Sequence, residues 1–200
     1  MENLELGRRK LMQSLAVVML GATLPIDLFA DNDVAQDKPA PIFIPAASGK
    51  HGKIGDGDIA FKFAKAQTGG HLGVVENILP VGLLGAPPHL HKGFDEICRV
   101  THGVLTVMVG EQTFEVKAGD WHLRPRGIVH SFWNVGNEPA KFIELFVPGG
   151  HEAYMNALAD LFIGGKRPQP GTLDALAKQF DIEFDWPRLK PLMDKYKVRL

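Results

Sequence analysis

The sequence predicts an all-β fold with C-terminal helices, in which many short strands form a sandwich or barrel. Apolar segments of strand length recur about every ten residues through the middle of the chain, and turn-forming residues separate them. Glycine and proline, with 22 and 14 residues, supply these turns. After Pro148 the apolar residues adopt helical spacing instead. A chain of 200 residues has room for one main domain and some additional length.

Charge and cysteine content limit the possible classes of function. The formal net charge is −1 and both signs are mixed along the chain. This argues against a nucleic-acid-binding protein, because such a protein needs a basic face. The single cysteine, Cys98, cannot form an intramolecular disulfide, and its place in an apolar run predicts a small buried residue.

Residues 1–30 are predicted to be a twin-arginine signal peptide. The segment Gly7-Arg8-Arg9-Lys10-Leu11-Met12-Gln13 resembles such a signal, and an apolar stretch follows from Leu15 to Leu24. That stretch is shorter than the roughly 20 residues that cross a bilayer, so a signal fits it better than a stable membrane span. We therefore expect an exported, periplasmic protein. The alternative is an amphipathic N-terminal helix on a cytoplasmic protein.

Residues 31–58 are predicted to be linker and loop, and residues 59–148 a barrel. The first segment is rich in proline, glycine, lysine and aspartate, although Ile42-Phe43-Ile44 could dock as a short edge strand. In the second segment, apolar patterning and turn signals predict a series of strands. These are expected near residues 59–66, 72–79, 96–100, 104–109, 113–116, 121–124, 131–134 and 141–147.

Residues 149–200 are predicted to be a helical extension that packs on the barrel. Apolar residues at helical spacing predict a first helix over residues 151–162, which Gly164-Gly165 ends. A second helix is expected from Thr172, as its N-cap, to about residue 180. A third short helix is expected over residues 189–197.

Three histidines and one glutamate have the spacing of a metal site. Alternate side chains of a strand share a face, so His89 and His91 point the same way. Glu96 has the wrong parity for one continuous strand, so the chain must turn over residues 92–95 before Glu96 begins the returning strand. His130 follows a separate turn and can reach the same interior. The four side chains would form a mixed nitrogen and oxygen site for one divalent transition metal.

The complete pattern around these residues resembles the two motifs of the cupin superfamily. His89, His91, Glu96 and Gly103 match the first motif, although its leading glycine, Gly82, lies one residue further from His89 than is usual. The second motif is matched by Gly119, Pro125, Gly127, His130 and Asn134. Residues outside the motifs resemble the single-domain, quercetin 2,3-dioxygenase-like branch. The resemblance implies a double-stranded β-helix barrel, or jelly roll, with His89, His91, Glu96 and His130 as metal ligands.

The resemblance also implies a function. We expect a metal-dependent dioxygenase that takes dioxygen and an aromatic or enolisable small molecule, with Glu96 as both ligand and catalytic proton acceptor. Fe, Mn or Ni is favoured over Cu, Co or Zn, since a protein that folds before export can bind a weaker-binding metal in the cytoplasm. A homodimer is expected. Two other functions stay open: a non-catalytic exported protein that holds a metal or ligand, and a non-redox metal-dependent isomerase or hydrolase.

The sequence does not decide which side chains of the strand over residues 121–124 point inward, because apolar and polar residues alternate along it. We expect Trp121 and Leu123 to face the interior, and His122 and Arg124 to face solvent. In the opposite orientation, Arg124 could hold an anionic substrate. His151 begins the first predicted helix and is a candidate for gating the mouth of the barrel.

Overall fold

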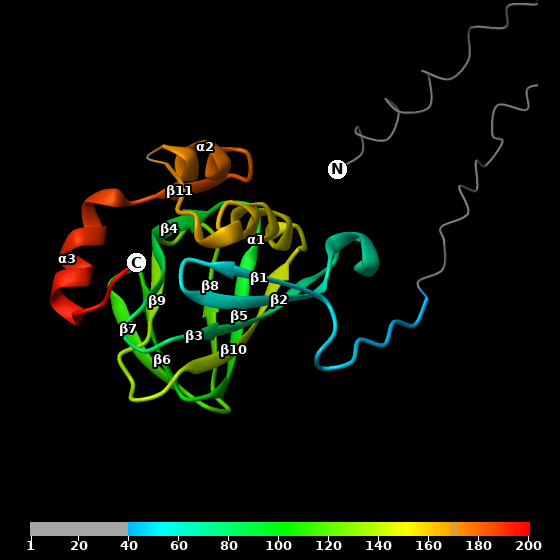
Figure 1. Cartoon of the computed structure of the whole chain (residues 1–200), viewed down its shortest axis with the longest axis horizontal. Helices are drawn as coiled ribbons and strands as arrows, with labels where there is room; N and C mark the ends of the chain where they lie inside the picture. The colour runs from blue at the N-terminus through cyan, green and yellow to red at the C-terminus, as the bar shows by residue number, and fades with distance from the viewer. Residues whose placement is uncertain (1–39, 170) are drawn as a thin grey trace, which may run out of the picture. The chain divides into compact units, whose positions relative to one another are not determined.

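The computed structural model describes residues 40–169 and 171–200. The predicted signal peptide and the beginning of the predicted linker lie outside these residues. The described part contains two antiparallel sheets that face each other, followed by three α-helices (Figure 1). The expected all-β fold with C-terminal helices is confirmed. None of the helices within the described residues is both long and apolar enough to cross a membrane.

The strand order of both sheets shows chain crossovers between neighbours that are distant in sequence. The six-stranded sheet has the order β1 (Lys50–Ile54), β2 (Gly57–Phe63), β3 (Gly73–Leu79), β10 (Ala140–Val147), β5 (Asp95–His102) and β8 (Trp121–Arg124). The five-stranded sheet has the order β11 (Ile182–Phe184), β4 (Leu84–His91), β9 (His130–Trp133), β6 (Val104–Val109) and β7 (Gln112–Lys117). Antiparallel neighbouring strands that are not consecutive in the chain are typical of a jelly roll.

The core lies between the two sheets and follows from strand alternation. Along β10, every second residue from Ala140 to Phe146 is buried, and the residues between them are exposed or half-buried. The inward positions of β5 and β6 add fully buried apolar side chains, among them Val100, Leu105 and Val107. One inward position of β10 breaks the apolar pattern, because it is occupied by the carboxylate of Glu144.

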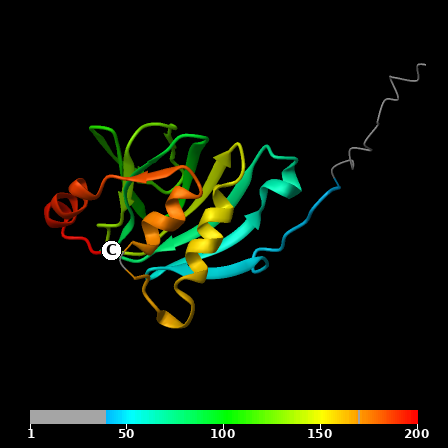
Figure 2. The ribbon, with the colours of Figure 1, turned by 90° about the horizontal axis from the view of Figure 1, so that it is seen from above.

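The C-terminal extension contains α1 (His151–Asp160), α2 (Thr172–Lys178) and α3 (Trp186–Tyr196), as well as a short 3₁₀ turn at Ile163–Gly165. Helices α1 and α2 lie side by side (Figure 2), and share an apolar cluster that includes Tyr154, Leu158 and Ala177. Helix α3 packs against β4 and β9. The predicted N-cap is wrong: Gly171, with φ of 81°, precedes α2, and no side chain caps the helix.

Three short segments differ from the sequence prediction. Strand β1 lies within the predicted linker and loop, and β11 lies within the predicted helical extension. By contrast, residues 42–44 form no strand. The sequence of β1, KHGKI, has no apolar alternation because most of its side chains are solvent-accessible, and the strand is defined by backbone pairing with β2. Such a strand leaves little trace in a hydrophobic pattern.

Candidate metal centre

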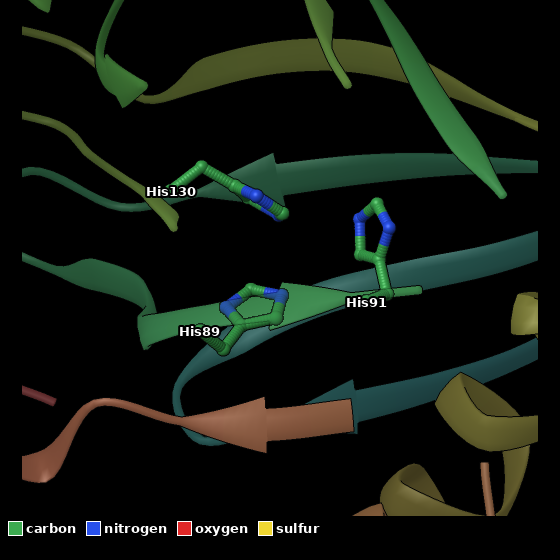
Figure 3. Close-up of side chains that lie close together, drawn as sticks. All are labelled: His89, His91 and His130. Carbon is green, nitrogen blue, oxygen red and sulfur yellow. The ribbon is translucent and has the colours of Figure 1, made fainter. Parts of the chain in front are cut away.

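Two neighbouring strands bring the three predicted histidines together. His89 and His91 lie on β4, His130 is the first residue of β9, and His89 is paired with His130 in the strand register. One ring nitrogen of each lies within 4.8 Å of those of the other two. Figure 3 shows His89 and His91 rising from one strand, with His130 reaching toward them from the neighbouring strand. The three rings are buried, and such a cluster could bind a metal ion.

Backbone carbonyls set the tautomer of all three imidazoles. The Nδ1 atom of His89 lies 2.8 Å from the carbonyl oxygen of Pro87, and that of His91 lies 2.8 Å from Phe94. The Nδ1 atom of His130 lies 2.9 Å from the carbonyl oxygen of Ile128. Since a carbonyl oxygen only accepts, each Nδ1 carries the proton, and each Nε2 of a neutral ring presents a lone pair. This is the arrangement that commonly orients a histidine for metal binding.

Glu96 faces the same point from the opposite sheet. It is the second residue of β5, after the turn that strand parity required between His91 and Asp95. Its Oε2 lies 3.4 Å from Nε2 of His91 and 3.4 Å from Nε2 of His130. Its other oxygen, Oε1, lies 2.9 Å from Nη1 of Arg124. One carboxylate oxygen is thus held by arginine, while the second is turned toward the imidazoles.

The protonation of these groups fits a bound cation. Burial, reinforced by His130, lowers the pKa of His89 well below its ordinary value, and burial also lowers the pKa of His130. Burial alone would raise the pKa of Glu96, but the Arg124 guanidinium and the imidazoles of His130 and His91 together outweigh it and hold this pKa well below the usual range. At neutral pH, the Nε2 lone pair of His130 therefore faces a carboxylate oxygen of Glu96 with no proton between them. A divalent metal ion would satisfy this donor set.

One known family model matches the part of the chain that holds this site. Residues 76–147, which include His89, His91, Glu96 and His130, match the family model described as "Cupin domain". The chain contains a cupin domain. The motifs that resembled this superfamily in the sequence thus lie in the matched region, whereas the quercetinase-like branch is a narrower prediction. Binding of a metal by the four side chains also stays a prediction.

Individual relatives support the fold of this cupin domain. Germin-like protein 1-1 from rice (Oryza sativa subsp. japonica) is 34% identical over 116 residues, which cover 56% of this chain and 51% of the relative. This chain spans about half the length of the germin-like relatives that it matches. The solved structure of KdgF from Halomonas sp. matches with a TM-score of 0.50 at 19% identity, over 57% of this chain and 99% of that one. A structure described as a predicted oxalate decarboxylase from Thermotoga maritima matches with a TM-score of 0.51 at 20% identity, over 54% and 99%.

The barrel and the C-terminal extension together line a cavity of about 250 Å³ next to the histidine cluster. His89 and Glu96 contribute to its wall, and so do residues of α1. Most of the remaining wall is apolar, with Leu79, Leu83, Leu84, Phe132, Phe142, Met155, Leu158 and Phe184 among its members. A small molecule in this cavity would lie beside the candidate metal ligands with little water around it.

The predicted orientation of β8 is wrong. Trp121 and Leu123 are 59% and 52% exposed, whereas Arg124 is fully buried and lines the cavity. The strand register explains this, because Arg124 is paired with Glu96 and shares its inward face. A buried carboxylate needs a partner charge, and this requirement outweighs the burial of two apolar side chains. Because Glu96 was predicted to point inward, a basic side chain such as Arg124 could have been expected beside it.

The sequence prediction missed two polar residues of the cavity, Glu144 and Asn77. Glu144 is 1% exposed and its Oε1 accepts a hydrogen bond of 2.6 Å from Nη2 of Arg124. Its Oε2 accepts a bond of 2.9 Å from Nδ2 of Asn77. Burial, and next the charge of Glu96, raise the pKa of Glu144 to about 8. Its inward parity with Phe142 and Phe146 could have indicated this position.

His151, the predicted gating residue, lies at the border between the metal cluster and α1. Its ring centroid is 5.9 Å from that of His91, and the ring packs among Phe94, Phe146 and Tyr154. It is 6% exposed and lines the cavity. Burial lowers the pKa of His151 to about 3, so the ring is neutral at physiological pH. The structure thus places His151 at the cavity, while a gating role stays a prediction.

Proposed function

We propose that this cupin domain is a metal-dependent dioxygenase that acts on a small aromatic or enolisable molecule. The observation that carries this proposal is the convergence of three Nε2 lone pairs and one oxygen of Glu96 beside a largely apolar cavity. His89, His91, Glu96 and His130 would hold one divalent transition metal. When bound, that ion would supply a Lewis acid for a substrate oxygen and an open position for dioxygen.

The residues of the chain would prepare the substrate for this chemistry. The apolar wall, formed in part by Phe132 and Phe142, would hold an aromatic ring and exclude water. Glu96 would accept the proton of the substrate hydroxyl through Oε2 once this oxygen has left the metal, because Arg124 stays paired with its other oxygen. The imidazoles cannot take this role while their Nε2 lone pairs serve as ligands.

The size of the cavity narrows the substrate. At about 250 Å³ it lies below the roughly 300–1,000 Å³ of typical sites for drug-sized ligands. This volume favours a substrate with one ring, or a short enolisable chain, over a flavonol with three rings. Quercetin-like flavonols remain a useful reference, since they represent the branch that the sequence resembles.

The experiment that tests the proposal is dioxygen uptake by the metal-loaded protein. Protein reconstituted with Fe²⁺, Mn²⁺ or Ni²⁺ would be given catechol, acetylacetone and quercetin, and we expect uptake that is fastest with one of the two smaller compounds. His89→Ala, which lacks one proposed ligand, should lose this uptake. If no metal supports uptake with any compound, the dioxygenase proposal fails. An activity without dioxygen would support the isomerase or hydrolase alternative, and binding without turnover would support a metal- or ligand-holding protein.

We also propose that the protein is exported to the periplasm and forms a homodimer. The support for export is the twin-arginine pattern at Arg8-Arg9. The support for a dimer is the outer face of the six-stranded sheet. Paired positions on four neighbouring strands form an apolar row there, consisting of Val74, Leu145, Ile97 and Leu123.

The row next to it provides complementary charges. It consists of Glu76, Ile143, Arg99 and Trp121 in strand order. A two-fold axis along β10, through Ile143, would place Glu76 of one copy opposite Arg99 of the other. A self-complementary face of this kind suits an isologous dimer. Sedimentation of the full chain should therefore give twice the monomer mass.

A further inference from the structure

Three buried ionisable side chains form a continuous chain across the six-stranded sheet. Glu144 on β10 accepts a hydrogen bond of 2.6 Å from Nη2 of Arg124 on β8. Nη1 of Arg124 lies 2.9 Å from Oε1 of Glu96 on β5. The three residues are 1%, 0% and 4% exposed. Asn77 on β3 extends the chain through its bond of 2.9 Å to Glu144.

Packing alone does not require these charges. The neighbouring inward positions of β10 hold Phe142 and Phe146, and the guanidinium of Arg124 lies 4.7 Å from the centroid of the Phe132 ring. Apolar residues of similar volume often replace a buried ion pair without loss of stability, because burial removes charges from water. The sequence retains a buried arginine and two carboxylates where apolar side chains would fit. We therefore look for a role of these three side chains in the metal site and not in packing.

The geometry links the chain to the orientation of Glu96. Arg124 binds Oε1 of Glu96, which turns Oε2 toward Nε2 of His91 and His130 at 3.4 Å. Glu144 accepts a hydrogen bond from the other terminal nitrogen of Arg124, whereas Nη1 faces Glu96 as an ion pair without a hydrogen bond. Because a guanidinium is planar and rigid, the bond to Glu144 orients Arg124 and so sets where its charge lies beside Oε1 of Glu96.

We propose that Arg124 and Glu144 are positioning residues that present a single oxygen of Glu96 to the metal. In this arrangement Glu96 is a one-oxygen ligand, and Arg124 blocks two-oxygen binding. Residues that orient the ligands of a metal commonly change its affinity about 10- to 100-fold when they are replaced. The inference rests on the proposed metal centre but is independent of whether that centre reacts with dioxygen.

Cobalt(II) titrated into the metal-free full chain tests this inference, with affinity and visible absorption as readouts. The double variant Arg124→Met/Glu144→Leu removes both partners of one contact and leaves only Glu96 buried without its cation. We expect it to fold with a melting temperature between those of Arg124→Met and the wild type, to bind cobalt about 10- to 100-fold more weakly, and to show an altered absorption spectrum. A double variant with wild-type affinity and spectrum would overturn the proposal.

The matched control is Lys190→Met/Asp194→Leu, which removes an exposed ion pair on α3. Its cobalt affinity should equal that of the wild type. A mutant cycle with Glu96→Gln then asks whether the pair acts through Glu96. The effect of Arg124→Met/Glu144→Leu should vanish in the Glu96→Gln background, and an undiminished effect there would overturn the positioning role. If His130→Ala retains wild-type cobalt affinity, it is the metal centre itself that fails.

Discussion

The two sheets of the barrel contribute different chemistry to the same site. The five-stranded sheet supplies the imidazoles, His89 and His91 on β4 and His130 on β9. The six-stranded sheet supplies the acidic and basic side chains, Glu96, Arg124 and Glu144, each on a different strand. The imidazoles are oriented locally by nearby backbone carbonyls, whereas the charged groups orient one another across strands. The orientation of the imidazoles therefore depends mostly on the nearby sequence, whereas that of Glu96, Arg124 and Glu144 depends on the register between strands.

Removal of one imidazole should have the largest effect. His130→Ala deletes a proposed ligand from the five-stranded sheet, so its loss of metal affinity should exceed the roughly 10- to 100-fold change typical of residues that only orient ligands. Metal content after dialysis measures this effect. His71→Ala, a change of an exposed histidine, serves as control. Equal metal contents in His130→Ala and the wild type would contradict the assignment of His130 as a metal ligand.

On the six-stranded sheet, a single replacement should cost more stability than a double one. Arg124→Met leaves Glu96 and Glu144 buried without their cation, and breaking a buried pair in this way costs about 3–5 kcal/mol of unfolding free energy. Arg124→Met/Glu144→Leu should recover much of that loss. Urea unfolding of the metal-free proteins measures both values. A double variant less stable than Arg124→Met would show that the charges are not a coupled unit.

The histidines of the five-stranded sheet could be predicted from the sequence, whereas the positions of Arg124 and Glu144 in the six-stranded sheet could not. The histidine spacing and the turn before Glu96 followed from strand parity within short segments. The orientation of β8 did not, since both parities of Trp121-His122-Leu123-Arg124 are chemically plausible until β8 is paired with β5. Glu144 lies outside both motifs, and the pairing of β10 with β5 brings it near Glu96. Strand β1 was missed for a related reason, because its stability comes from backbone pairing.

A smaller effect concerns pH and the histidine at the border between the sheets and α1. The pKa of His151 falls from 6.5 to about 3 in the folded state, so the unfolded state binds more protons between these values. Stability attributable to the neutral ring is thus present above pH 6.5 and is lost as the pH falls toward 3. In His151→Phe, which suits the surrounding aromatic rings, the unfolding free energy of the metal-free protein should decline less steeply over this range. An unchanged slope would contradict the assignment.

The smallest effect on the site is expected from the outer face of the six-stranded sheet. Leu123→Glu introduces a charge into the apolar row, whereas the inward residues on the same strand stay in place. We expect sedimentation to show monomers instead of dimers, with unchanged affinity for cobalt. Lys117→Glu, an exposed change on β7 of the other sheet, should leave the mass unaltered. A dimer that survives Leu123→Glu would place the interface elsewhere.

The pairing of His89 with His130 also has a consequence for the topology of the chain. About forty residues separate the two histidines in sequence, and this segment contains β5, β6, β7 and β8. An ion held by both side chains would close that segment into a loop, as a covalent cross-link does, and would reduce the conformational entropy of the unfolded chain if it stayed bound there. An ion that binds only the folded chain would stabilise it by mass action instead. In either case, the metal would join β5 to the five-stranded sheet through Glu96, and its removal should speed unfolding of the whole barrel.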